Sequence, residues 1–235
     1  MMDNDYTIID NFLSCELHDE VCIGVRELHN MFDDSDYNGN EFITLGTPER
    51  LNSGRMKTMP NFLKKYLNIV LTKDTNLFFQ NILYIKHMKD GIPWHVDSQV
   101  KDRIQESCTV KYVNMLQNSL PDIDSICVYY PFVPDGLKGG SFLLKTSDDT
   151  IKEVEIKSNR MIKIKGTIEH RTDTIANNNN NYRVSMITEQ VKLPAVFDTI
   201  IKKDGFLYDG TFDDVIIDDE TNHYIDWDHA GCYTD

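Results

Sequence analysis

The sequence predicts an α+β domain in which short antiparallel strands form a sandwich or barrel, supported by helices near the N-terminus. Two observations lead to this prediction. Apolar residues recur at helical spacing before residue 72, whereas short runs with the two-residue period of strands dominate from residue 76 onward. The composition agrees with a folded domain, because 40% of the residues are hydrophobic and 26% are charged.

The helices are expected in the N-terminal third of the chain. Ser14 is a residue type that caps helices, and it precedes apolar residues at helical spacing, namely Leu17, Val21, Val25 and Leu28. A second helix is expected to begin near Pro60, a favoured first-turn residue, and to continue to Leu71. The residues between these helices, 33–58, are polar and glycine-rich.

The strands are separated by glycine, proline and asparagine. We expect them at 77–86, from Trp94 onward, and at 125–132, 141–144, 154–156, 161–165 and 182–189. The breaks between them include Gly91-Ile92-Pro93, the Gly139-Gly140 pair and the five asparagines at 177–181. Residues 98–121 are mixed in pattern, with a helix expected around 101–117.

The charge of the chain is unevenly distributed. The formal net charge is −14, from 38 acidic and 24 basic residues. This excess argues against a protein that grips a nucleic-acid backbone along its whole surface, because phosphate binding needs lysine and arginine. Residues 192–235 hold many of the acidic side chains. We expect them to form an acidic C-terminal extension, packed on or beside a main domain of residues 1–191.

The sequence also predicts a location. The 5 cysteines are scattered without a CxxC pair, which is typical of free thiols in a reducing compartment. The first residues contain no basic region followed by an apolar run of signal-peptide length, and no segment has the ~20 apolar residues that cross a bilayer. We therefore expect a soluble protein of the cytoplasm or another intracellular compartment, without a membrane partner.

The residues with the chemistry of a metal site begin at Trp94-His95-Val96-Asp97. Residues two apart on a strand point to the same face, so His95 and Asp97 can bind one ion. His170 follows the strand at 161–165, and an antiparallel double-stranded β-helix would bring it to the same place. Two histidines and one carboxylate are the facial ligand set of non-haem Fe(II). The alternative is an ordinary polar pair on a strand surface and a polar residue at a strand end.

Arg183 and Ser185 lie two residues apart in the last strand and therefore face the same way. The planar guanidinium of Arg183 suits a carboxylate better than a lysine would, and Ser185 can donate a hydrogen bond to the same group. Arg171 is a poor candidate for this role. It follows His170 directly, so it would point to the opposite face of the strand.

This ordered set resembles the Fe(II)/2-oxoglutarate-dependent dioxygenases over about residues 6–190. Three segments are similar to the prolyl-4-hydroxylase-like branch, namely Ile9–Ser14 with the helix after it, Gly139-Gly140-Ser141-Phe142, and Ser158–Ile164. The resemblance implies a jelly-roll core, Fe(II), 2-oxoglutarate and O2. It also implies an oxidoreductase that hydroxylates an unactivated C–H bond and releases succinate and carbon dioxide. Ascorbate can support such an activity.

Carried over by position, the resemblance makes His95, Asp97 and His170 the metal ligands at the catalytic centre. It also makes Arg183 the anchor of 2-oxoglutarate, with Ser185 beside it. Tyrosines are expected near the co-substrate as well. Tyr84 stands on the strand before the HxD motif, where the family often has a tyrosine in contact with 2-oxoglutarate, and Tyr129 or Tyr130 could act in the same way from the middle strand.

The sequence departs from the prolyl-4-hydroxylase-like pattern in two places. The gap between Asp97 and His170 is longer than the family usually shows, with the excess in 98–121, and Arg183 stands where many prolyl hydroxylases have lysine.

The expected substrate is a protein or peptide side chain rather than a small molecule. The AlkB-like nucleic-acid demethylases are an alternative, but they have a second arginine where this chain has Glu189. A third hypothesis is a non-catalytic jelly-roll binding module, against which the intact ligand set argues.

Overall fold

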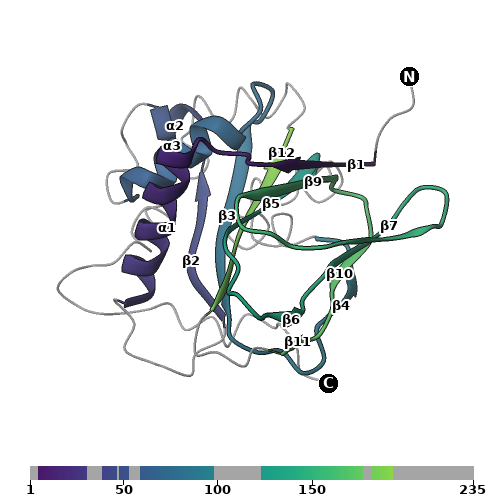
Figure 1. The fold of residues 1–235 in the computed structure, drawn as a ribbon. Helices are drawn as coiled ribbons and strands as arrows, with labels where there is room; N and C mark the ends of the chain where they lie inside the picture. Colours follow the sequence, from purple (N-terminus) through teal and green to yellow (C-terminus); the bar gives the residue numbers. More distant parts are fainter. Residues whose placement is uncertain are drawn as a thin grey trace, which may run out of the picture.

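The computed structural model describes residues 5–30, 39–46, 48–52, 59–97, 123–176 and 182–192. Figure 1 shows helices on one side of a large sheet and a smaller sheet on its other side. The large sheet has the order β1 (Tyr6–Asp10), β9 (Arg160–Lys165), β5 (Ser125–Phe132), β12 (Arg183–Val191), β3 (Leu77–Ile85) and β2 (Gly39–Gly46). The small sheet has the order β4 (Ile92–His95), β10 (His170–Thr172), β7 (Phe142–Lys145) and β8 (Ile151–Val154).

All strand pairings within the described residues are antiparallel. A further pair, β6 (Lys138–Gly139) and β11 (Ile175–Ala176), closes one end of the molecule in Figure 1. The antiparallel α+β architecture predicted from the two-residue periods is thus confirmed. No described helix is long and apolar enough to span a bilayer.

The helices α1 (Cys15–Asn30) and α3 (Asn61–Val70) cover the outer face of the large sheet. α1 starts as the sequence predicts, because the Ser14 hydroxyl accepts a hydrogen bond from the Leu17 N–H at 3.4 Å. The two helices approach closely at Gly24, where a Cβ would lie 2.1 Å from the ring of Phe62. Their apolar stripes and the outer face of the sheet form one hydrophobic core.

Asn159 ties the N-terminal segment to this core. Its backbone has a φ of +58°, a left-handed conformation that asparagine tolerates better than most residues. The side chain donates to the Leu13 carbonyl and accepts from the Leu13 N–H, each at 3.0 Å. The Tyr129 hydroxyl also donates to it at 3.2 Å. The Asn159 turn therefore fixes the start of α1 against the sheet.

The second core lies between the two sheets, and the alternation along each strand decides which residues enter it. On β12, Arg183, Ser185 and Glu189 face the small sheet, whereas Val184 and Met186 belong to the core beneath the helices. Both faces of β12 are buried, which is why its sequence lacks the alternation of a half-exposed strand. The inward polar residues of β12 thus open into the space between the sheets.

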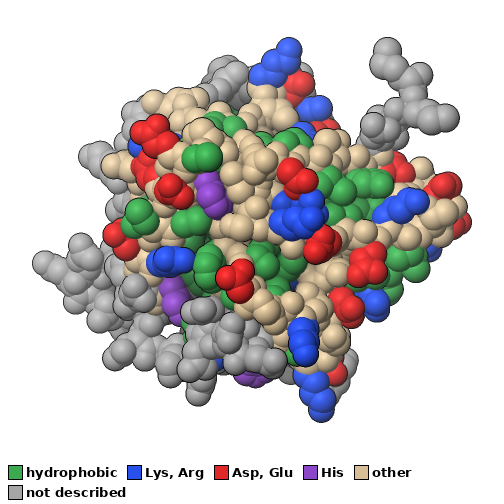
Figure 2. Space-filling model, viewed as in Figure 1, with side chains coloured by type: hydrophobic (Ala, Val, Ile, Leu, Met, Phe, Trp, Pro, Cys, Tyr) green, Lys and Arg blue, Asp and Glu red, His purple; other side chains and the backbone are tan. Residues whose placement is uncertain are grey.

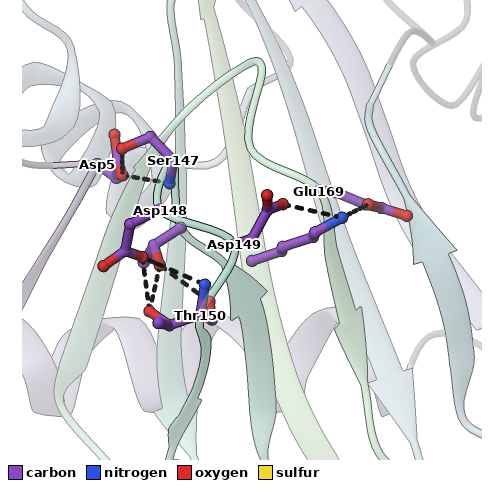
Figure 3. A network of polar contacts seen from close by, with 8 residues as sticks. Asp5, Ser147, Asp148, Asp149, Thr150 and Glu169 are labelled. Carbon is purple, nitrogen blue, oxygen red and sulfur yellow. Dashed lines mark hydrogen bonds and ion pairs between the residues drawn. The ribbon is translucent and has the colours of Figure 1, made fainter.

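The hairpin between β7 and β8 is held by a polar network at its turn (Figure 3). The Ser147 N–H and hydroxyl donate to a carboxylate oxygen of Asp5, at 2.8 and 2.6 Å. Lys145 lies between two carboxylates, 3.4 Å from Asp149 and 3.9 Å from Glu169. The Lys145 N–H also donates to the Glu169 carbonyl at 2.9 Å, which joins this hairpin to the residue that precedes His170.

Several sequence-based expectations need adjustment. Residues 33–58, for which no element was predicted, contain β2 and the short helix α2 (Pro48–Asn52). β2 adds to the edge of β3 through backbone pairing, which polar composition alone does not reveal. The strand expected at 154–156 lies earlier, at β8. The expected helix at 101–117 and the acidic extension after residue 192 lie outside the described residues.

On the face drawn in Figure 2, acidic and basic side chains are interspersed, with hydrophobic groups between them. The described part of this face therefore carries no continuous patch of one sign, although the chain has a net charge of −14. The charge of the whole chain is thus a poor guide to the local field at any one point of this surface.

Candidate metal centre and co-substrate cavity

The structure brings His95, Asp97 and His170 together between the two sheets. The three side chains offer ligand atoms that all lie within 4.8 Å of one another. His95 and His170 are directly opposite on the paired strands β4 and β10, and their ring centroids are 4.4 Å apart. The Asp97 carboxylate lies 3.2 Å from Nε2 of His95 and 3.5 Å from Nε2 of His170.

Backbone carbonyls hold both imidazoles in the orientation that a metal ligand needs. Nδ1 of His95 donates to the Pro93 carbonyl at 2.8 Å, and Nδ1 of His170 donates to the Ile168 carbonyl at 2.9 Å. A carbonyl only accepts, so the proton of each neutral ring resides on Nδ1. Nε2 of each ring lies beside Asp97. It is the atom left to bind a metal when the ring is neutral, and it donates a hydrogen bond to Asp97 when the ring is protonated. Such contacts behind metal-ligating histidines fix the tautomer and the ring orientation.

The electrostatics of the triad favour a carboxylate that stays ionised. Burial acts to raise the pKa of Asp97, but hydrogen bonds from His170 and His95 outweigh it and hold this pKa well below its usual range. For His95, burial acts to lower the pKa, while the hydrogen bonds to Asp97 and the Pro93 carbonyl raise it above its usual value. An anionic oxygen and two imidazole nitrogens therefore converge, a donor set that suits a divalent transition metal.

Arg183 is buried in the same space, with 1% of its surface exposed. Its Nη1 donates to the Gly140 carbonyl at 3.2 Å, and its Nε is buried without a hydrogen-bond partner among the described residues. Burial lowers the pKa of the Arg183 guanidinium, and the nearby Tyr130 counteracts this only in part. A buried N–H group without an acceptor is costly, and an anion in the cavity would satisfy it.

The Gly139-Gly140 turn places this arginine. Both residues have left-handed backbone, with φ of +74° and +76°, which glycine adopts without the cost that other residues incur. A Cβ on Gly139 would lie 2.1 Å from the Thr174 carbonyl oxygen, and a Cβ on Gly140 would lie 3.3 Å from Nη1 of Arg183. The turn can therefore approach Arg183 only because neither residue has a side chain.

The triad and the arginine line one cavity of about 480 Å³. Ser185 also lines it, and its hydroxyl is buried without a partner among the described residues. Asn81, which no sequence motif singled out, lines the cavity as well, and its side-chain oxygen is likewise buried and unpartnered in the described part of the chain. A polar residue in the middle of the apolar strand β3 was the signal that could have identified it. Glu189 lines the cavity too and is 2% exposed.

The two tyrosines expected at the co-substrate lie elsewhere. Tyr84 and Tyr129 belong to the core beneath the helices, on the opposite face of the large sheet from the cavity. The Tyr84 hydroxyl donates to the Val25 carbonyl of α1 at 2.6 Å. The structure corrects their expected position. Successive residues of β3 and β5 point to opposite faces of the sheet, and Tyr84 and Tyr129 fall on the face that packs against the helices. Tyr130, the alternative on β5, does line the cavity.

Tyr130 forms a wall beside the arginine. The guanidinium carbon of Arg183 lies 5.8 Å from the centroid of the Tyr130 ring, within the range of a cation–π contact. Burial raises the pKa of Tyr130 to about 12, so its hydroxyl stays protonated and can donate a hydrogen bond. The cavity thus has a cationic, hydrogen-bond-donating region around Arg183, Ser185 and Tyr130, separate from the triad.

No protein-family model matches the sequence, and no curated protein matches it either. Solved structures do share its architecture. A prolyl-4-hydroxylase from Pseudomonas putida is similar at a TM-score of 0.50 and 12% identity, over 82% of this chain and 95% of that one. A prolyl 4-hydroxylase from Phytophthora capsici gives a TM-score of 0.47 and 14% identity, over 87% of this chain and 68% of that one.

A 2OG-Fe(II) oxygenase family oxidoreductase from Burkholderia pseudomallei gives a TM-score of 0.45 and 11% identity, over 80% of this chain and 84% of that one. Identities this low speak to the fold rather than to the substrate. The likeness to the Pseudomonas putida enzyme supports a core of packed antiparallel sheets such as that enzyme has. The chain has the fold of the Pseudomonas putida prolyl-4-hydroxylase, and its motifs resemble those of the Fe(II)/2-oxoglutarate oxygenases.

Proposed function

We propose that this protein is a non-haem Fe(II)/2-oxoglutarate-dependent dioxygenase that hydroxylates a C–H bond on a protein or peptide side chain. One observation supports this more than any other. A set of two imidazoles and one carboxylate shares a single cavity with a buried arginine whose Nε has no partner among the described residues. An ion site and an anion site within one cavity are what a bidentate keto acid needs.

His95, Asp97 and His170 would hold the metal through Nε2, a carboxylate oxygen and Nε2. Three protein ligands on one face of an ion leave positions for a co-substrate and oxygen. When bound, Fe(II) and 2-oxoglutarate would supply the oxidation chemistry, in which decarboxylation to succinate accompanies hydroxylation of the substrate. The two backbone carbonyls that accept from Nδ1 hold both rings in the tautomer and orientation that this role needs.

Arg183 and Ser185 would bind the carboxylate of 2-oxoglutarate that is remote from the metal. The guanidinium is fixed by Gly140 and Tyr130, so it loses little freedom when the anion arrives. The apolar residues of the core between the sheets lower the local dielectric constant and would strengthen that ion pair. We also propose that the two sheets form the two halves of a double-stranded β-helix, with the cavity between them.

A protein or peptide substrate is the choice that the shared prolyl-4-hydroxylase fold supports. The nucleic-acid alternative is less favourable because the cavity contains the carboxylate of Glu189, where the AlkB-like pattern has a second arginine. The 98–121 segment, which lies outside the described residues, directly follows Asp97 and is our candidate for substrate recognition.

The experiment is an assay of uncoupled turnover. Purified protein with Fe(II), ascorbate and 2-oxoglutarate should release succinate slowly, and His95→Ala or Asp97→Ala should abolish this release. Tyr84→Phe is a matched control, because its hydroxyl binds α1 and should leave turnover unchanged. Absence of succinate, together with absence of Fe(II) and Mn(II) binding, would refute the proposal. Incubation with peptide libraries and mass spectrometry for a gained oxygen atom would then identify the substrate.

A further inference from the structure

Trp94 and Arg171 meet on the outer face of the small sheet, directly behind the two histidines of the triad. Trp94 precedes His95 on β4 and Arg171 follows His170 on β10, so alternation turns this pair away from the cavity. The guanidinium carbon of Arg171 lies 5.3 Å from the centroid of the Trp94 ring, within cation–π range. Side chains of β4 and β10 thus contact each other on both faces of the sheet, the two imidazoles on the cavity face and the Trp94–Arg171 pair on the outer face.

β4 has few other attachments. It is an edge strand of four residues, and within the described part of the chain its neighbour in the sheet is β10 (Figure 1). The pairing is itself irregular, since His170 pairs with His95 and Thr172 with Ile92, with a register shift between them. Asp97 lies just beyond the end of β4. The places of His95 and Asp97 therefore depend on how this short strand is held.

Arg171 is not held by an ion pair in the described structure. No described carboxylate bridges to it, and its Nε is buried without a hydrogen-bond partner. A buried donor left unpaired is unfavourable, so its packing against Trp94 must offset that cost. A planar guanidinium can stack on an indole, whereas a lysine ammonium cannot reproduce this geometry.

We propose that Trp94 and Arg171 are positioning residues that set the separation and orientation of His95 and His170, and thereby the metal affinity of the site. This inference rests on the proposed function, because it concerns the ion that the triad would bind. Groups that hydrogen-bond metal ligands commonly change metal affinity about 10–100-fold, and we place this contact, which acts through the strands, at the low end of that range. We expect Trp94→Leu and Arg171→Met each to weaken Mn(II) binding about 10-fold.

The test measures Mn(II) affinity by isothermal titration calorimetry and the environment of the bound ion by electron paramagnetic resonance. Thermal unfolding with EDTA reports the fold without metal. Trp94→Phe keeps an aromatic face and should therefore retain most of the Mn(II) affinity that Trp94→Leu loses. The double variant should bind no more weakly than the weaker single variant, since both remove one contact. Ile151→Ala, at an exposed position on β8 in the same sheet, should leave affinity and line shape unchanged.

Where Trp94→Leu fails to fold, Arg171→Lys replaces it, because it keeps the charge and removes the plane. It should also weaken Mn(II) binding. Folded variants with wild-type affinity and an unchanged line shape would overturn this inference alone. A wild-type protein that binds neither Mn(II) nor Fe(II) would overturn the proposed function, and this inference with it.

Discussion

Replacing Arg183 by methionine separates its role in binding from any role in folding. The substitution removes the buried charge and leaves a side chain of comparable length. A charge-assisted hydrogen bond contributes about 1.5–3 kcal/mol, which corresponds to roughly 10–150-fold in affinity. We therefore expect the KM for 2-oxoglutarate to rise by about that factor, with Mn(II) affinity unchanged.

The effect on stability should be small or favourable. In the described structure Arg183 makes one hydrogen bond, to the Gly140 carbonyl, and its Nε has no partner. Losing that bond costs about 1 kcal/mol, whereas removing an uncompensated buried charge commonly stabilises by a similar or larger amount. The free energy of unfolding without ligand should thus stay within about 1 kcal/mol of wild type, or increase.

Three measurements test this reasoning, namely urea unfolding without ligand, calorimetry of 2-oxoglutarate with the Mn(II)-loaded protein, and succinate release. Arg26→Met is the matched control, because that guanidinium stacks on Phe132 at 4.8 Å outside the cavity and should leave the KM unchanged. A variant that loses more than about 2 kcal/mol of stability, and loses metal and 2-oxoglutarate binding together, would show that Arg183 is structural.

Three further predictions follow from the described contacts. Gly140→Ala should raise the KM for 2-oxoglutarate and cost about 1–2 kcal/mol of stability, because the added Cβ would press on Arg183 from a left-handed backbone; kinetics and urea unfolding check this. Tyr84→Phe should lower stability by about 0.5–1.5 kcal/mol, because the Tyr84 hydroxyl donates to a backbone carbonyl of α1. A raised KM for 2-oxoglutarate would contradict this and place Tyr84 at the co-substrate. Asp10→Asn should lower stability at neutral pH but not in strong acid. The hydrogen bond from Arg160 lowers the pKa of Asp10 in the folded protein, so the stabilisation by Asp10 is complete above its unfolded-state pKa and is lost as the pH falls through its folded-state pKa. Chemical unfolding at several pH values should show the stabilities of wild type and variant converging in acid. A difference that stays constant with pH would contradict this.

Much of the fold could be predicted because it depends on local pattern. The apolar stripe of α1 and the cap at Ser14 are both visible in the sequence, and both are present in the structure. The strand expected at 125–132 coincides with β5. β2 could not be predicted, because its sequence has no strong strand pattern and it forms by pairing with the edge of β3.

The candidate site was predictable where the chemistry is carried by spacing. Arg183 and Ser185 are two residues apart on β12, so alternation places them on one face. His95 and Asp97 have the same spacing, and they converge on one site although β4 ends at His95. The facing of Tyr84 and Tyr129 could not be predicted. Both faces of β3 and β5 are buried, so the strands show no alternation that distinguishes the cavity side from the helix side.

The sequence by itself determined the ligand types and their order along the chain. Only the tertiary structure decided that His95 and His170 pair directly across β4 and β10, and that the Nε atom of Arg183 remains unpartnered in the described part of the cavity. The physical reason is range. Spacing within one strand follows from the geometry of the backbone, whereas register between strands and the burial of a charge are set by packing among segments far apart in the chain.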